Sequence, residues 1–140
     1  MSLIDAESAL NVLLASTLSG YNIVFENMGD SETGPYEPAV DETYVEQNWL
    51  PGRPVVIGYG ECTKQRYLGI YQVTVSTPAY KGKKASDDVI ALLETAFDIG
   101  TAVSYNSQTV RCREFYTGPP DRSQPGRFRV PVNIRFQADV

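Results

Sequence analysis

The stretch Arg66–Phe97, RYLGIYQVTVSTPAYKGKKASDDVIALLETAF, changes its hydrophobic period once along its length. From Tyr67 to Val75 apolar side chains fall on alternate positions, which predicts a strand with one face on a core. After a loop that contains Pro78 and Gly82, the apolar positions follow helical spacing at Val89, Leu92, Leu93, Ala96 and Phe97. The stretch therefore predicts a long strand followed by an amphipathic helix that folds back over it.

The ends of this helix carry the residues that helix ends prefer. Asp87 and Asp88 fall in the first turn, where a carboxylate suits the positive end of the helix dipole. Gly100 follows the last turn, where a left-handed residue commonly ends a helix. We therefore expect the helix to end shortly before Gly100.

The N-terminal residues predict a second helix. Ser2 and Asp5 resemble a capping box, and apolar residues recur at helical spacing as far as about Leu18, before Gly20. A short strand is predicted over Tyr21–Glu26, followed by a long acidic loop over Met28–Asp41. A weaker strand over Thr43–Trp49 and a turn over Leu50–Pro54 are predicted next.

The rest of the chain alternates strands with turns. Val55–Gly60 is expected to be a loop that packs on the core before a strand pair within Cys62–Val75. Beyond the central helix we predict two strands, Thr101–Tyr105 and Thr109–Tyr116, joined by a turn at Asn106–Ser107. An exposed proline-rich loop over residues 117–126 and a last strand over Arg127–Phe136 are expected to follow.

The last strand has the most regular alternation in the chain. Five apolar residues are expected on its core face and five others on its outer face: Phe128, Val130, Val132, Ile134 and Phe136 against Arg127, Arg129, Pro131, Asn133 and Arg135. Because proline cannot donate to a ladder, Pro131 predicts that the strand is an edge there or carries a bulge.

The length of 140 residues is typical of one domain, and a globule of this size buries roughly two-thirds of its unfolded surface. We therefore treat residues 1–140 as a single domain. No apolar run approaches the roughly 20 residues of a membrane span, and no basic residue precedes the first apolar positions as in a signal peptide. These patterns predict a soluble protein used without export.

Without a sign of an oxidising compartment, two buried thiols are favoured over a disulfide between Cys62 and Cys112.

Charge is distributed unevenly along the chain. No lysine or arginine precedes Arg53, whereas nine carboxylates lie between Asp5 and Glu46; from Gln47 onward twelve cations face eight carboxylates. One interpretation is chance combined with solubility. The other is that acidic and basic surfaces meet, between copies of this chain or with a partner, since complementary potentials steer protein contacts.

The composition offers little for catalysis. The chain has no histidine, which removes the usual general base and the usual metal ligand. The adjacent pairs Asp41–Glu42 and Asp87–Asp88 point to different sides of a strand or helix, and no zinc, calcium or phosphate-loop spacing occurs. The sequence therefore predicts no enzyme, no cofactor and no metal site.

Nucleic-acid binding is an alternative from another class. Arginines on the predicted last strands, with Phe115 and Tyr116 nearby, could present cations and stacking rings to a single strand: Arg111, Arg113, Arg127, Arg129 and Arg135. The sequence pI near 4.7 and the acidic N-terminal third oppose this interpretation and favour a solvated or subunit-facing sheet surface.

Several segments, in this order and spacing, resemble the tail terminator family of long-tailed (siphovirus-type) bacteriophages. They are the FEN of Phe25–Asn27, the GIYQVTVSTPAYKGKKASDDVIALLETAF of Gly69–Phe97, the GT of Gly100–Thr101 and the GRFRVPVNIRFQA of Gly126–Ala138. The acidic loop from Asp30 to Asp41 and the segment STPAY depart from the family's usual pattern.

The resemblance implies an α+β domain, with a mostly antiparallel β-sheet and two α-helices. It also implies a structural virion protein that assembles in the host cytoplasm as a hexameric ring on the head-proximal end of the tail tube. Such a ring stops tube polymerisation and joins the head. The implied partners are further copies of this chain, the major tail tube protein and a head–tail connector or head-completion protein, while DNA only passes through and no membrane takes part. A head-to-tail joining or head-completion protein of the same neck region is the alternative.

Such a ring requires a contact that closes on itself, together with two faces that bind different partners. We expect these contacts in the acidic loop, in the loop that begins at Lys81 and on the last strand: Asp30, Glu32, Glu37, Asp41, Lys81, Lys83, Lys84, Arg127, Arg129 and Arg135. The acidic loop could pair with the arginines of a neighbouring subunit, or its carboxylates could line the channel so that DNA passes without sticking.

Overall fold

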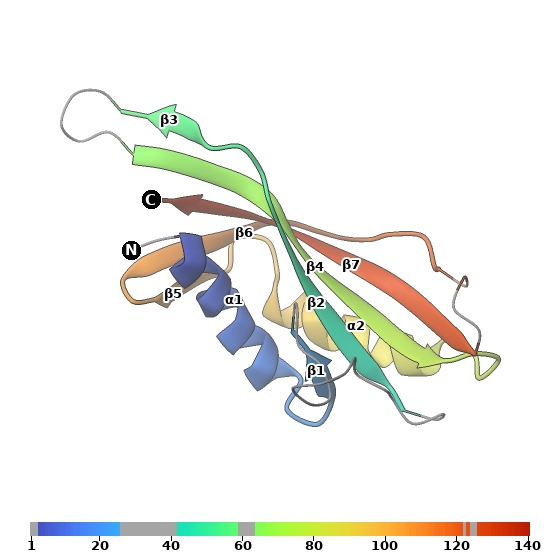
Figure 1. Cartoon of the computed structure of the whole chain (residues 1–140). Coiled ribbons are helices and arrows are strands. Elements are labelled where there is room, and N and C mark those ends of the chain that lie inside the picture. Colours follow the sequence, from blue (N-terminus) through green and yellow to red (C-terminus); the bar gives the residue numbers. More distant parts are fainter. Residues whose placement is uncertain (1–2, 26–41, 59–63, 122, 124–125) are drawn as a thin grey trace, which may run out of the picture.

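The computed structural model describes residues 3–25, 42–58, 64–121, 123 and 126–140. A long, twisted sheet runs across the molecule, and two helices lie on one of its faces (Figure 1). The helices are α1 (Leu3–Thr17) and α2 (Lys84–Ala96). The strands are β1 (Asn22–Val24), β2 (Tyr44–Pro51), β3 (Val55–Ile57), β4 (Lys64–Pro78), β5 (Ala102–Tyr105), β6 (Gln108–Thr117) and β7 (Arg127–Asp139).

The sheet has seven strands in the order β1-β2-β4-β7-β6-β5, and β3 pairs with β4 outside this path. Only β1 and β2 run parallel; the other pairs of these strands are antiparallel. The longest pairing joins β4 to β7, from Arg66 opposite Asp139 to Pro78 opposite Arg127. The expected α+β fold with a mostly antiparallel sheet and two helices is therefore confirmed.

The core lies between the sheet and the two helices. Alternate residues of β4 and β7 are fully buried there, as the period of two predicts: Tyr71, Val73, Val75, Val132, Ile134 and Phe136. Val89 and Leu93 of α2, and Phe97 just after it, pack into the same cluster, whereas Leu92, predicted on that face, is 44% exposed. The aromatic rings of Trp49 and Phe136 stack with centroids 4.4 Å apart.

Two predicted turns have the expected backbone. Gly100, just after α2, has φ of 88°, the left-handed conformation expected there. Asn106 and Ser107 also have positive φ, 48° and 67°, which matches the turn that joins the two strands of a tight hairpin. The prediction of a turn at Asn106–Ser107 is confirmed.

The segment that begins at Val55 differs from its prediction as a core-packed loop. Val55–Ile57 forms β3, paired with Lys64–Arg66 of β4, and Val55 and Val56 are 57% and 62% exposed. The apolar run between Pro54 and Gly58 is too short to show a period, so its hydrophobicity alone suggested burial. Cys62 lies outside the described residues, and β4 is one strand of 15 residues that begins at Lys64.

The prediction of an edge or bulge at Pro131 holds only locally: β7 lies between β4 and β6, but its pairing with β6 ends at Val132, opposite Thr117. The Gly118 N–H donates to the Pro131 carbonyl, 2.8 Å away, where β6 ends. Since the nitrogen and carbonyl of one strand residue point to the same side, the missing donor of Pro131 faces the end of β6 and not β4. The bulge of this pairing lies instead in β6, between Cys112 and Glu114.

Within the described part of the chain, neither helix is long and apolar enough to cross a membrane.

Candidate assembly surfaces

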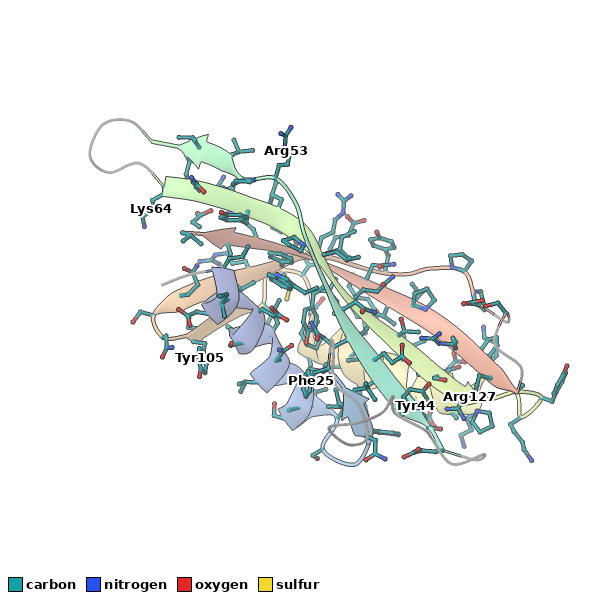
Figure 2. All side chains as sticks on the ribbon, in the orientation of Figure 1. Phe25, Tyr44, Arg53, Lys64, Tyr105 and Arg127 are labelled. Carbon is teal, nitrogen blue, oxygen red and sulfur yellow. The ribbon has the colours of Figure 1, made fainter. Side chains whose placement is uncertain are left out.

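The face of the sheet away from the helices carries the predicted arginines. Arg127, at the start of β7, is only 7% exposed. Its guanidinium donates to Ser76 Oγ (3.0 Å), to the Ser76 carbonyl (3.2 Å) and to the Glu42 carbonyl (2.6 Å). It also lies over the ring of Tyr44, 4.9 Å from the centroid. Arg127 therefore ties the starts of β2 and β7 together inside the subunit, as Figure 2 shows for the labelled Tyr44 and Arg127.

The neighbouring arginines also contact groups of the same chain. Arg129 forms an ion pair with Glu46 of β2, and Arg135 Nε lies 3.7 Å from a carboxylate oxygen of Glu114. Arg113 donates to Gln137 Oε1 at 2.7 Å. Much of the positive charge on this face therefore meets a polar or acidic group of the same subunit.

The three predicted lysines cluster at one tip of the molecule. Lys81 and Lys83 lie in the turn between β4 and α2, Lys84 begins α2, and all three are exposed. Tyr80, just before them, is fully exposed and has φ of 65°. The structure thus brings the lysines together with an exposed ring, at the end of the sheet where β7 begins.

The acidic residues predicted to pair with the arginines of a neighbouring subunit, Asp30, Glu32, Glu37 and Asp41, lie outside the described residues. Of the carboxylates that follow them, Glu46 contacts Arg129 within one subunit. The expectation that the acidic loop, the lysines and the arginines form contacts between subunits stays a prediction.

Sequence reasoning missed a projecting surface, which we call the arm and define as residues 50–58 and 64–70. Figure 1 shows β3 and the start of β4 reaching beyond the helices, on the side of the two chain ends. The base of the arm is closely packed: a Cβ on Gly52 would lie 2.1 Å from the Leu68 carbonyl oxygen, and one on Gly69 would lie 2.6 Å from the Leu50 carbonyl oxygen. Only glycine fits at both positions, and the paired glycines were the one available signal.

One face of the arm is apolar. The register places Leu50 opposite Ile70 and Val55 opposite Arg66, so these residues share a face with Leu68. Leu50, Leu68 and Val55 are each about half exposed. The described residues of the arm carry three cations, Arg53, Lys64 and Arg66, and no carboxylate; Glu61 falls in the part that the structure does not describe. The arm is thus a basic surface with an apolar centre.

The outward face of α2 has the opposite charge. From residue 85 to residue 110 the chain has four carboxylates and no lysine or arginine. All four are exposed on α2 or just after it, at Asp87, Asp88, Glu94 and Asp98, and Leu92 lies exposed among them.

The described residues offer no group of three or more side chains that could hold a metal ion. Cys112 is a buried free thiol, and burial raises its pKa to about 11. Burial, and then the charge of Glu7, raise the pKa of Tyr71, whose hydroxyl donates to Asn11 Oδ1 at 2.6 Å. Both groups stay protonated at neutral pH, so they act in packing.

One known protein family matches almost the whole of this chain. A family model described as "Phage tail terminator protein" matches residues 7–136, nearly the whole chain. The chain belongs to the phage tail terminator family. The resemblance seen in the sequence is therefore confirmed, and tail terminators are structural proteins of the virion. No curated protein matches the chain.

Two solved structures share the fold of this chain at low sequence identity. One has 17% identity and a TM-score of 0.73, with 99% of this chain and 96% of that chain covered. The other is a chain from "Virion of native gene transfer agent (GTA) particle", with 15% identity, a TM-score of 0.57 and coverage of 95% and 93%. At such identities the likeness shows the fold alone.

Proposed function

We propose that this protein caps the head-proximal end of a phage tail tube as a hexameric ring, stops tube polymerisation and provides the surface to which the filled head is joined. The observation that carries the proposal is the family match across residues 7–136. The function requires shape and contacts but no reaction, so we propose that the protein is not an enzyme and that it binds no cofactor.

The fold supplies surfaces that suit a ring. The arm and the outward face of α2 lie on different parts of the subunit, so one can contact the other on the next subunit around an axis. Such a heterologous contact closes when the rotation per subunit divides a full turn. The lysine tip and the two sheet edges remain for contacts with the tube and with the connector or head-completion protein.

Deletion of the gene from the phage tests the role directly. A terminator is expected to leave overlong tubes without heads, because nothing stops polymerisation. Normal-length tails that fail to attach would instead assign the protein to head completion, the alternative role in the same neck region. Electron micrographs of lysates, with the gene supplied in trans as the control, distinguish the two results.

Binding of the purified protein to labelled single-stranded oligonucleotides, measured across a range of salt, tests the nucleic-acid alternative. A terminator through which DNA only passes should show no salt-dependent binding in the micromolar range. Tight binding that weakens with salt would contradict the proposal.

A further inference from the structure

We propose that the arm of one subunit docks on the outward face of α2 of the next copy of this chain, and that this is the contact that closes the ring. The inference rests on the proposed ring and deepens it by naming the two surfaces. It follows from exposure, charge and position within the fold.

The first argument is exposure. The arm presents Leu50, Val55 and Leu68 on one face, each about half exposed, and α2 presents Leu92, also about half exposed. Specific interfaces place apolar residues at the centre and charged residues at the rim. The arm has this arrangement, because Arg53 and Lys64 flank its apolar residues. On α2, Asp88 lies one turn before Leu92 on the same side of the helix, and Glu94 lies at the other side of the exposed surface.

The second argument is charge. The charged residues of the described arm are all cations, and α2 with the residue that follows Phe97 carries four exposed carboxylates against one exposed lysine, Lys84, at its first position. Arg66 Nε lies 2.9 Å from Asp139 Oδ1 of the same subunit. Arg53 and Lys64 are therefore the cations of the arm that we expect to contact the neighbouring copy. Complementary surfaces of this kind steer association and fix its register.

The third argument is position. The arm projects past one end of the subunit, whereas α2 lies under the middle of the sheet (Figure 1). In Figure 2, Arg53 points away from the ribbon and from the helices. The arm is held in place at its base. Gly52 and Gly69 pack backbone against backbone there, and the backbones of Gln65 and Val140 exchange two hydrogen bonds, of 2.9 and 2.8 Å. The arm therefore cannot fold back onto the α2 of its own subunit. The contact must therefore be made by another copy.

Charge reversal tests the contact. In an arm variant, Arg53→Glu and Lys64→Glu, and in a helix variant, Asp88→Lys and Glu94→Lys, each subunit would repel its own kind. We expect each variant alone to lose ring-sized particles in mass photometry and negative-stain images, with and without tube ends. An equimolar mixture is expected to recover rings, because alternating subunits place each reversed arm on a reversed helix and each native arm on a native helix.

The matched control for the arm variant is Arg111→Glu with Arg113→Glu, which changes the net charge by the same amount on exposed positions of β6 and should leave the rings intact. Circular dichroism confirms that each variant is folded. Rings formed by the arm variant or by the helix variant alone, or a mixture of folded variants that forms none, would overturn the inference.

A crosslink provides a second measurement that does not depend on charge. With Cys62→Ser as background, Val55→Cys and Leu92→Cys on one chain should join neighbouring copies through a short bis-maleimide, giving a ladder that ends at the ring size. Either single cysteine should give no ladder.

The two levels of the proposal can fail separately. Assembled rings without the ladder would overturn the arm contact and leave the terminator role standing. A parent protein that makes no ring even on tube ends would overturn both.

Discussion

Arg127 shows how a residue that suggests a binding surface in the sequence can instead serve folding. On the last strand it alternates with apolar residues and belongs to a row of arginines, which is the pattern of a charged outer face. The structure covers that position with Tyr44 and places Ser76 and Glu42 beside it. Nothing local in the sequence indicates a cover that begins 85 residues earlier.

We predict that Arg127→Met destabilises the subunit by about 1–3 kcal/mol, because the buried Ser76 and Glu42 carbonyls lose their charged donor. Urea unfolding followed by Trp49 fluorescence measures the loss. Arg111→Met, which removes an exposed cation from β6, serves as the control and should change stability by less than about 0.5 kcal/mol. Equal effects of the two substitutions would show that the Arg127 contacts contribute nothing.

A second residue-scale prediction concerns acid stability. The Arg66 guanidinium, hydrogen-bonded to Asp139, lowers the pKa of that carboxyl from its ordinary value. The pair therefore stabilises the fold above the unfolded pKa of about 3.9, and this contribution is lost as pH falls through the lower folded value.

Asp139→Asn should lower the melting temperature at neutral pH, and the difference from the parent should shrink toward zero as the pH falls through the lowered pKa of Asp139. Melting curves from pH 7 to 2 test this expectation, with the exposed Glu94→Gln as control. A difference that stays constant over the whole range would exclude the ion pair as its cause.

At the scale of elements, the sequence predicts what depends on neighbours along the chain. The long alternation of β4 and β7, the spacing of α2 and the Asn106–Ser107 turn are all local patterns, and each is found. The error at β3, and the position of Pro131 in a strand that is otherwise central, depend on which strand lies beside the segment. Strand order is set by packing between distant parts, and one alternating strand looks the same at an edge and in the centre.

The glycine pair at the base of the arm gives a prediction of its own. Gly69→Ala should destabilise the subunit by about 1–3 kcal/mol, because the new Cβ would meet backbone atoms of Leu50 and Gly52 and the ring of Phe136, all within 3 Å. Gly20→Ala, where a Cβ meets nothing within 4 Å, is the control. Thermal melts that show the same change for both substitutions would contradict this account of the crossing.

At the scale of the whole molecule, the uneven charge of the chain corresponds to separate surfaces. The sequence predicts the excess of carboxylates before Arg53, but the acidic loop that carries most of them lies outside the described residues. The structure reveals a second division that the net charge hides, between the basic arm and the acidic face of α2. Pairing of surfaces far apart in the chain cannot be predicted from a single sequence.

We predict that ring assembly weakens as salt rises from about 0.05 to 0.5 M, because the Debye length falls to well below 10 Å over this range. The protein concentration at half-assembly, measured by light scattering, should rise with salt for the parent and for the control Arg111→Glu with Arg113→Glu. Assembly that is insensitive to salt would indicate that apolar contacts alone hold the ring.

The unbroken run of β4 has a mechanical consequence. This strand contributes both to the arm and to the body, and thirteen of its residues pair with β7. A force that pulls the arm along the strand direction would act on all of these hydrogen bonds at once, in shear. It would not break them one at a time. A subunit held by its arm would transmit tension into its centre before any single bond broke.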